Sequence, residues 1–214
     1  MARPRSDIKP RIVHAARRRF LKEGVDGASL RNIAKDAGTS IGMVYYYFPA
    51  KDDLFLAVVE EVYAKLLADM ARALEPGAPV RERISRLYAR VGAISDTELS
   101  TVQLVAREVL VSSSRFSRLI ARFQRGHIPL ILATLTDGVD EGSIDPELAP
   151  TLLLLCTFSL GAVPQLIRRA AGKRLPMADL PEGDSFAAEL VSVLFDGIGS
   201  ARISVTRRST HEQP

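Results

Sequence analysis

Residues 29–51 read SLRNIAKDAGTSIGMVYYYFPAK, and this stretch decides how the N-terminal part of the chain folds. Ser29 can cap a short helix in which apolar residues recur at one-face spacing. Gly38 supplies the permissive backbone that a tight turn needs. Ser40 can cap a second short helix that runs to Phe48. Two short helices joined by a short turn that contains glycine predict a helix-turn-helix.

A longer helix is expected immediately before this motif, over residues 7–23. In it Ile12, Ala16 and Phe20 repeat every four residues and form one apolar stripe. Gly24 is expected to end the helix. The three helices together predict a compact N-terminal domain.

Helical spacing continues through the rest of the chain, and no stretch alternates apolar and polar residues long enough to indicate a sheet. Asp145-Pro146 is a strong helix start, because proline at the first helical position costs no hydrogen bond. Further helices are expected near residues 51–74, 80–94, 97–112, 116–141, 146–171 and 184–201, with a loop over 172–184. The sequence therefore predicts an all-α fold of about nine helices, divided into a helix-turn-helix domain (1–50), a helical body for effector binding and dimerisation (51–203) and a disordered tail (204–214).

Composition narrows the class of protein. The chain has 214 residues, one cysteine (Cys156) and three histidines spread along the sequence. A single cysteine excludes an internal disulfide, and the N-terminus lacks an apolar leader, so we expect a cytoplasmic protein. Neither a four-ligand zinc cluster nor another metal or cofactor is expected. No nucleophile elbow, phosphate loop or paired metal-ligand motif points to an enzyme.

Charge is distributed unevenly along the chain. Residues 1–51 hold eleven Lys and Arg against four Asp and Glu, whereas residues 52–214 hold 18 against 21. A basic domain on a mildly acidic body is typical of a protein that binds a polyanion with one end.

Three consecutive tyrosines follow the turn. Tyr45, Tyr46 and Tyr47 step about 100° apart on a helix, so they cannot all face the core. We expect Tyr47 to pack inward and the other hydroxyls, with Lys51 just beyond the helix, to reach phosphate oxygens.

These residues resemble the DNA-binding domain of the TetR family of bacterial transcriptional repressors. The resemblance spans residues 11–56, about a fifth of the chain, and covers these positions: Ile12, Ala15, Ala16, Phe20, Gly24, Ile33, Ala34, Ala37, Gly38, Ser40, Gly42, Tyr45, Tyr46, Phe48, Lys51 and Leu54. The chain departs from the family pattern at Ile41, Tyr47 and Ala50, so base contacts cannot be carried over by position.

The resemblance implies a homodimer that binds operator DNA with its first three helices and a small-molecule effector with its body. The residues that it implies for DNA binding are Ser29, Arg31, Ser40, Gly42, Met43, Tyr45, Tyr46 and Lys51. No metal ion and no cofactor are implied.

Residues 148–167 contain no charge and are long enough to cross a hydrocarbon layer of roughly 30 Å. A membrane span is one interpretation. Two prolines and several polar residues within the segment argue against it, so we favour a helix that is covered by the core on one side and by a partner subunit or ligand cavity on the other.

Apolar body helices that carry an occasional polar group are candidates for the effector pocket. The candidates are Leu104, Phe116, Phe123, His127, Leu152, Cys156, Phe158 and Gln165. His127 can equally be a hydrogen-bonded structural histidine, and Arg107 and Glu108 can form either an internal ion pair or a ligand clamp. Few charges in these helices indicate a mostly apolar effector.

The sequence therefore predicts a ligand-responsive repressor that binds a palindromic operator as a homodimer and leaves it when the effector binds. Two alternatives remain at this point. One is a small-molecule-binding or catalytic helical protein whose basic domain is incidental, and the other is a membrane-associated protein that uses residues 148–167.

Overall fold

The structure is a computed structural model that describes residues 7–171, 180–181 and 183–198. The expected tail (204–214) and most of the expected loop (172–184) lie outside the described residues. Within those ranges the chain forms ten α-helices and no strand. They are α1 (Ile8–Gly27), α2 (Leu30–Asp36), α3 (Ile41–Tyr47), α4 (Lys51–Ala73), α5 (Val80–Gly92), α6 (Asp96–Val111), α7 (Ser113–Phe123), α8 (His127–Asp140), α9 (Pro150–Ala171) and α10 (Asp184–Asp196). The all-α prediction is confirmed.

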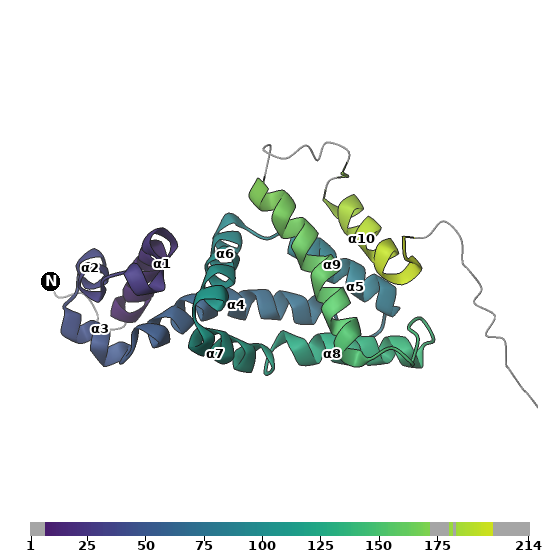
Figure 1. Ribbon diagram of the computed structural model, residues 1–214, viewed down its shortest axis with the longest axis horizontal. Coiled ribbons are helices and arrows are strands. Elements are labelled where there is room, and N and C mark those ends of the chain that lie inside the picture. The colour runs from purple at the N-terminus through teal and green to yellow at the C-terminus, as the bar shows by residue number, and fades with distance from the viewer. Residues whose placement is uncertain (1–6, 172–179, 182, 199–214) are drawn as a thin grey trace, which may run out of the picture.

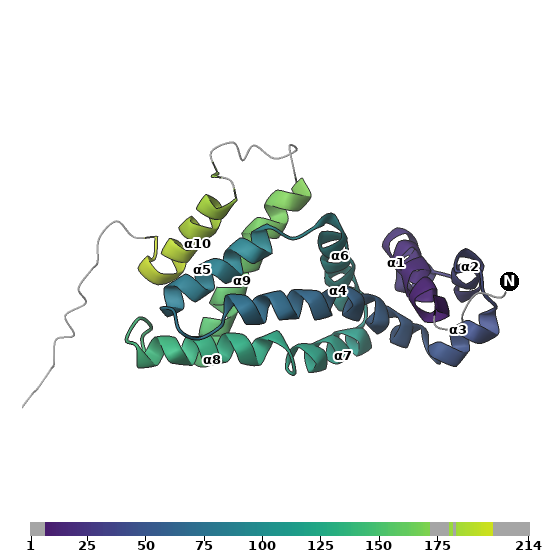
Figure 2. The ribbon, with the colours of Figure 1, turned by 180° about the vertical axis from the view of Figure 1, so that it is seen from behind.

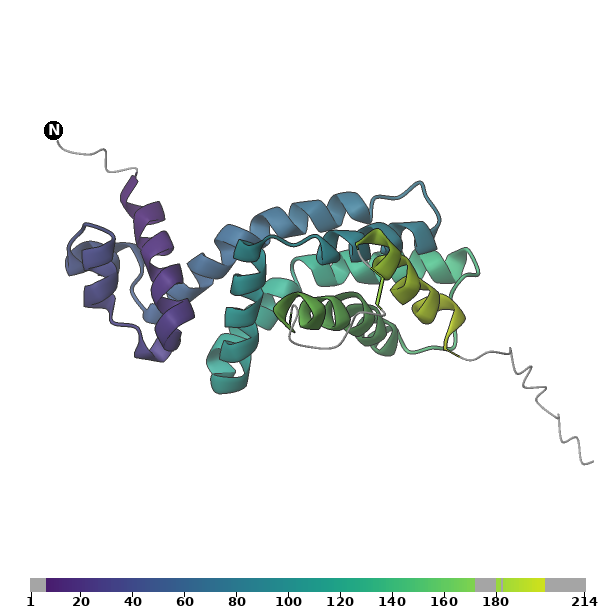
Figure 3. The same cartoon turned by 90° about the horizontal axis from the view of Figure 1, so that it is seen from above.

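Helices α1, α2 and α3 gather at one end of an elongated molecule, here called the head (Figure 1). Helix α4 runs from the head into the body. Helix α7 lies beside its first half, through pairs such as Arg118 with Asp53, and α5 and α8 lie beside its second half (Figure 2). Seen from above, α9, α10 and the far end of α6 lie on one side of the body, and α4 and α5 lie on the other (Figure 3).

The head has its own apolar core. Ile12, Phe20, Ile33 and Val44 are fully buried in it, and α4 contributes Phe55. Leu104 of α6 and Leu119 of α7 belong to the same cluster. The core of the head is therefore continuous with the nearest part of the body.

A break in α1 separates its long first part from its last turn. Gly24 has φ 79° and ψ 165°, a backbone conformation that favours glycine because it lacks Cβ. The helix that the sequence predicts to end at Gly24 thus breaks there, and one further turn continues to Gly27.

Polar contacts join α5 to α9 in the body. Tyr88 Oη donates to the carbonyl of Thr157 at 2.8 Å, and Gln165 Nε2 donates to the carbonyl of Tyr88 at 2.8 Å. A Cβ on Gly161 would lie 2.2 Å from the Tyr88 ring. Glycine at 161 therefore lets the tyrosine ring press against the backbone of α9.

One predicted helix, 116–141, is wrong in its continuity. The chain leaves α7 at Phe123 and starts α8 at His127, with Gly126 as the N-cap. The signal was Pro129, because proline inside a continuous helix clashes with the carbonyl four residues earlier. In the structure Pro129 occupies the first turn of α8, where no backbone N–H is needed.

Two other boundaries differ from the prediction. Asp145 accepts the amide of Glu147 with Oδ1 at 2.9 Å and so forms a turn, and α9 begins at Pro150 rather than at Pro146. Proline does stand first in the helix, but it is Pro150 and not the Pro146 that the sequence indicated. Helix α10 ends at Asp196, where Gly197 takes φ 76°, and residues 199–201 of the predicted helix lie outside the described residues.

Candidate nucleic-acid interface and regulatory body

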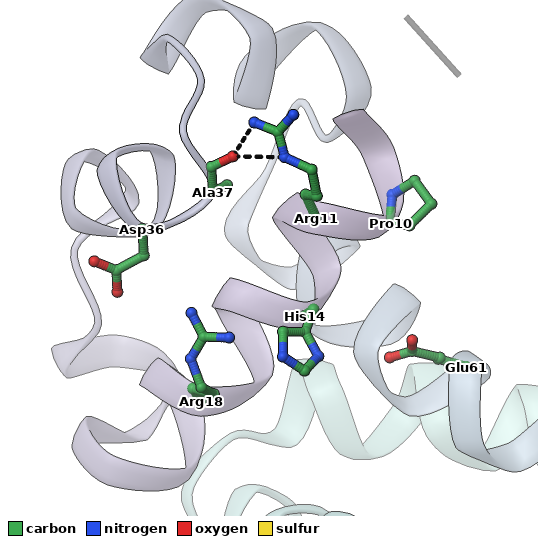
Figure 4. Close-up of a pocket in the computed structure, with 7 residues that line it drawn as sticks. All are labelled: Pro10, Arg11, His14, Arg18, Asp36, Ala37 and Glu61. Atoms are coloured by element: carbon green, nitrogen blue, oxygen red, sulfur yellow. Dashed lines mark hydrogen bonds between the residues drawn. The ribbon is translucent and has the colours of Figure 1, made fainter. Parts of the chain in front are cut away.

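The turn between α2 and α3 is fixed by a side chain from α1. Arg11 Nε donates to the carbonyl of Ala37 at 2.9 Å (Figure 4). Arg11 Nη2 donates to the carbonyl of Gly38 at 2.7 Å. These carbonyls lie at the end of α2, where the helix has no amides left to satisfy them. Arg11 therefore holds the turn that orients α3.

Helix α3 presents an exposed polar face. Ser40 Oγ accepts the amide of Met43 at 3.3 Å, as expected of its N-cap. The Tyr45 and Tyr46 side chains point into solvent, with 76% of Tyr46 exposed. Tyr47 packs partly against the head core, and its ring lies 5.2 Å from that of Tyr46 in an edge arrangement.

The start of α4 lies beside α3 at the tip of the head. Lys51 Nζ donates to the carbonyl of Asp26 at 2.9 Å, which holds the ammonium near the surface. Asp53 Oδ2 accepts the amide of Ala50 at 3.0 Å, so one half of a helix cap remains although Ala50 has no polar side chain. The guanidinium of Arg118 keeps the pKa of Asp53 below its ordinary value.

The remaining residues predicted to bind DNA also lie on α2 and α3. Ser29 is the N-cap of α2 but makes no side-chain cap bond. Arg31 and Gly42 are exposed, and Met43 is half-buried. A Cβ on Gly42 would have only Ser40 Oγ within 4 Å, at 3.8 Å, so the backbone here is open to close approach.

A hollow of about 360 Å³ lies between α1, the end of α2 and α4 (Figure 4). His14 and Arg18 of α1 border it together with Asp36 of α2 and Glu61 of α4. Both acidic and basic side chains line this hollow, and the exposed tyrosines are not among its lining residues.

The eight predicted effector residues occupy several different environments. Leu104 is buried in the head core, and Gln165 Nε2 is bonded to the carbonyls of Tyr88 and Gly161. Phe116, Leu152, Cys156 and Phe158 are exposed. Phe123 and His127 meet each other, with ring centroids 4.9 Å apart.

Tyr63 of α4 joins these two rings and was not predicted. Its hydroxyl accepts the backbone amide of His127 at 3.1 Å, and the hydroxyl hydrogen is then free for Nδ1 of the same residue at 2.9 Å. Burial first, and then the nearby Arg122, lower the pKa of His127 to about 4. His127 is thus hydrogen-bonded within the chain, as the structural alternative from the sequence requires.

A second hollow of about 470 Å³ lies farther along the same pair of helices, α4 and α8. Leu74, Leu130 and Ala133 supply apolar walls. Arg83 lies buried in its lining, with Nε and Nη2 donating to the carbonyl of Leu74 and Nη1 to Asp137 at 2.5 Å.

Helix α9 leaves an apolar face uncovered. Its exposed residues recur at one-face spacing and include Leu152, Leu155, Cys156, Val163 and Ile167. By length and hydropathy, residues 150–170 pass as a candidate membrane span, and only 22% of the tested window is buried within the chain. A helix of a soluble protein can pass the same test when it packs against another subunit.

The sequence did not predict an ionic cluster that the structure shows between Asp26, Asp52, Glu108 and Arg115. Arg115 is 5% exposed and lies between the three carboxylates, where α6 and α7 meet the head. The signal available was an Arg within the apolar-faced helix 113–123, whose partners lie far away in the sequence. Among the described residues, no three His, Cys, Asp or Glu side chains are grouped so that they could hold a metal ion.

The chain has a helix-turn-helix whose second helix exposes polar side chains at the tip of a basic head, and this head is joined to a helical body. This combination defines a DNA-binding regulator of transcription. Residues 12–58 match the family described as bacterial regulatory proteins, tetR family. This domain is that of the TetR family, and the chain is a DNA-binding transcriptional regulator.

Two curated relatives come from Bacillus subtilis (strain 168). The uncharacterized HTH-type transcriptional regulator YhgD is 26% identical over 161 residues, which cover 72% of this chain and 82% of that protein. The fatty acid metabolism regulator protein is 21% identical over 133 residues, which cover 62% of this chain and 69% of that one.

Two solved structures share the fold. The transcriptional regulator FadR from Bacillus subtilis, in complex with stearoyl-CoA, aligns with a TM-score of 0.73 at 18% identity, covering 89% of this chain and 99% of that one. The fatty acid degradation regulator FadR from Bacillus halodurans aligns with a TM-score of 0.65 at 19% identity, covering 90% and 99%.

The burial of His127, which lowers its pKa, predicts a specific pH dependence of stability. The pKa of His127 is near 4 in the folded chain and 6.5 ordinarily, so the unfolded chain takes up the proton first as the pH falls. The free energy of unfolding should therefore drop by about 2 kcal/mol between pH 7 and pH 5 on account of this residue. We expect His127→Asn, which keeps an acceptor for Tyr63 but does not titrate, to lack that part of the drop in urea unfolding.

His14→Asn, at an exposed position on α1, is the matched control and should retain the wild-type pH curve. Parallel curves for the wild type and His127→Asn would contradict the assignment.

Proposed function

We propose that this protein is a cytoplasmic, non-catalytic repressor that binds a palindromic operator as a homodimer and releases it when an effector with a long apolar chain binds the body. The observation that carries the proposal is the exposed face of α3 at the tip of the basic head. Tyr45 and Tyr46 extend from it into solvent, and Lys51 follows at the start of α4.

Contacts to DNA are assigned by chemistry. Hydroxyls and ammonium groups suit phosphate oxygens, so we assign Ser29, Ser40, Tyr45, Tyr46 and Lys51 to the sugar-phosphate backbone. Gly42 and Met43 lie at the N-terminal end of α3, the part of a recognition helix that reaches base edges in this motif. Arg31 is exposed on α2 and adds positive charge beside them.

Two heads are needed for specific binding. Helix α3 has only 7 residues, so one copy can read few bases. A two-fold dimer would place two such helices about 34 to 36 Å apart, or a multiple of that, in successive major grooves.

The exposed apolar face of α9 suits the dimer contact. Leu152, Cys156 and Phe158, first considered for the effector pocket, lie in solvent on α9. Helix α10 lies on the same side of the body (Figure 3) and exposes the small residues Ser185, Ala188 and Ser192, which permit close helix packing. We assign these residues to the contact between the two copies, and Phe116 of α7 remains a candidate for either site.

For the effector we assign the seam between α4 and α8. Phe123 and His127 pack against Tyr63 at one point of this seam, and the hollow walled by Leu74 and Leu130 lies at another. The seam is apolar with few polar groups, which fits an acyl chain better than a compact polar molecule. The similar Bacillus subtilis regulator was crystallised with stearoyl-CoA, which supports the same ligand class here.

DNA binding should depend steeply on salt and on the exposed hydroxyls. On a duplex that the protein selects from a random library, we expect affinity to fall by about 10³ to 10⁵ between 50 and 200 mM salt if 6 to 10 phosphates are contacted. Tyr46→Phe should weaken binding by roughly fivefold per protomer, because one hydrogen bond to phosphate is lost. Fluorescence anisotropy measures both effects.

Tyr47→Phe is the matched control, since this ring packs against the head core, and it should bind as the wild type does. Equal losses in the two variants, or selection of no duplex at all, would count against the proposed interface.

The dimer should depend on the face of α9. Leu155 is exposed in the single chain, so Leu155→Glu leaves the monomer fold intact but places two like charges across a two-fold contact. We expect this variant to sediment as a monomer at micromolar concentration while the wild type and Thr136→Glu, an exposed position on α8, sediment as dimers. A monomeric wild type would overturn the dimer proposal.

Effector release is tested with stearoyl-CoA. We expect it to lower the affinity for the selected duplex by about 5- to 150-fold, a coupling typical of two linked sites. Coenzyme A without the acyl chain is the control and should have no effect, because it lacks the apolar part that the seam would bury. An equal effect of both compounds, or of neither, would refute the assigned ligand class.

A further inference from the structure

The head is attached to the body by two kinds of contact. The first is apolar, because Leu104 and Leu119 share a core with the head. The second is an ionic cluster centred on the buried Arg115 of α7. Apolar contacts hold surfaces together without strong directional preference, whereas a guanidinium fork fixes the direction of its partners.

Arg115 contacts three acids from three helices. Nε donates to Asp52 Oδ1 at 2.9 Å, and Nη1 donates to Glu108 Oε2 at 2.5 Å. Nη2 and Nη1 both donate to the carboxylate of Asp26 in the last turn of α1. One side chain of the body is thus bonded to the end of α1 and to the start of α4.

Helix α6 grips the break in α1 directly. Glu108 Oε1 accepts the amide of Val25 at 3.2 Å, just after the residue at which the helical backbone is interrupted. Arg107 Nη2 donates to the carbonyl of Phe20 at 2.5 Å, one helical turn before Gly24. Adjacent side chains of α6 therefore satisfy backbone groups on both sides of Gly24.

The two carboxylate oxygens of Glu108 link these contacts. One oxygen binds the backbone of α1 and the other binds Arg115, and Glu108 itself is 3% exposed. Between Arg115 and Glu108, which are both buried, each bond constrains the others because water does not readily replace a lost partner. Asp52 is partly exposed and Asp26 is exposed, so they extend this buried pair to the surface. The cluster Asp26, Asp52, Glu108 and Arg115 is here called the clamp.

We propose that Arg115 is a positioning residue for DNA recognition: through the clamp it fixes the angle between head and body, and thereby the half-site spacing that the dimer accepts. The inference rests on the proposed dimeric function. Because Arg115 is bonded both to the end of α1 and to the start of α4, a rotation of the head about the clamp displaces α3, which lies between them in the sequence. One base pair changes the spacing by about 3.4 Å and rotates the second site about the duplex axis.

The test measures spacing selectivity separately from the strength of each head. Arg115→Met and Arg115→Lys are compared with the wild type on the selected duplex, on duplexes with one base pair inserted or removed between half-sites, and on a single half-site. We expect the preference for the selected spacing to fall by at least about fivefold in both variants. Binding to the single half-site should stay within about twofold of the wild type, since the α3 surface is untouched.

Arg118→Met is the matched control. Arg118 lies one turn further along α7 and pairs with Asp53 at 2.6 Å, but it is largely exposed and outside the clamp. Its loss should leave spacing selectivity unchanged, because an exposed ion pair contributes little. The proposal is overturned if both Arg115 variants keep the wild-type spacing preference, or if Arg118→Met loses it equally.

A second readout does not depend on DNA or on dimerisation. Spin labels at Lys35→Cys in the head and Thr136→Cys in the body, in a Cys156→Ser background diluted with unlabelled chain, report the distance between head and body. We expect a narrow distribution in the wild type and in Arg118→Met, and a broader one in Arg115→Met. Equal widths would refute the clamp, whereas a broadened distribution in a protein that selects no duplex would uphold the clamp and refute the proposed function.

Discussion

The continuity of α4 is the constraint on which the rest of the structure depends. Leu54, Phe55 and Val58 of its first half lie in the core of the head, and Met70 of its second half lies in the core of the body. An unbroken helical hydrogen-bond ladder over 23 residues joins the two cores, so neither can rotate freely about a flexible linker. A change at the seam between α4 and α8 therefore has a rigid element through which it can reach the head.

Helix α4 fixes the separation of the two cores, and the apolar contacts of Leu104 and Leu119 together with the clamp oppose rotation of the head about the axis of α4. Two kinds of contact hold the head against the body, apolar packing and ion pairs. Burial of Phe20 and Leu119 supplies attraction that tolerates small displacements, whereas the Arg115–Glu108 pair tolerates fewer, because both side chains are buried and a displaced carboxylate would lose its partner. The bonds from Arg115 to Asp52 and Asp26 add direction at sites that solvent reaches.

The sequence predicted the head almost entirely, since its signals are local: helical spacing, caps such as Ser40, and the turn at Gly38. It predicted the body less well. The break before His127 was missed because apolar spacing continues across it, although Pro129 marked it. The contacts of Arg115 were beyond prediction from local pattern, because its partners lie up to 89 residues away and only the folded chain brings them together.

The uncharged stretch 148–167 includes most of helix α9. Burial within one chain covers one side of α9 through Thr157 and Gln165, whose polar atoms face α5, and leaves the opposite side apolar. A membrane span would place lipid around the whole helix, and Gln165 would then need a partner in hydrocarbon. In the structure its amide is bonded to the carbonyl of Tyr88, so the chain itself covers that side of α9. In the proposed dimer, a second copy would cover the opposite side with the same residues across a two-fold axis.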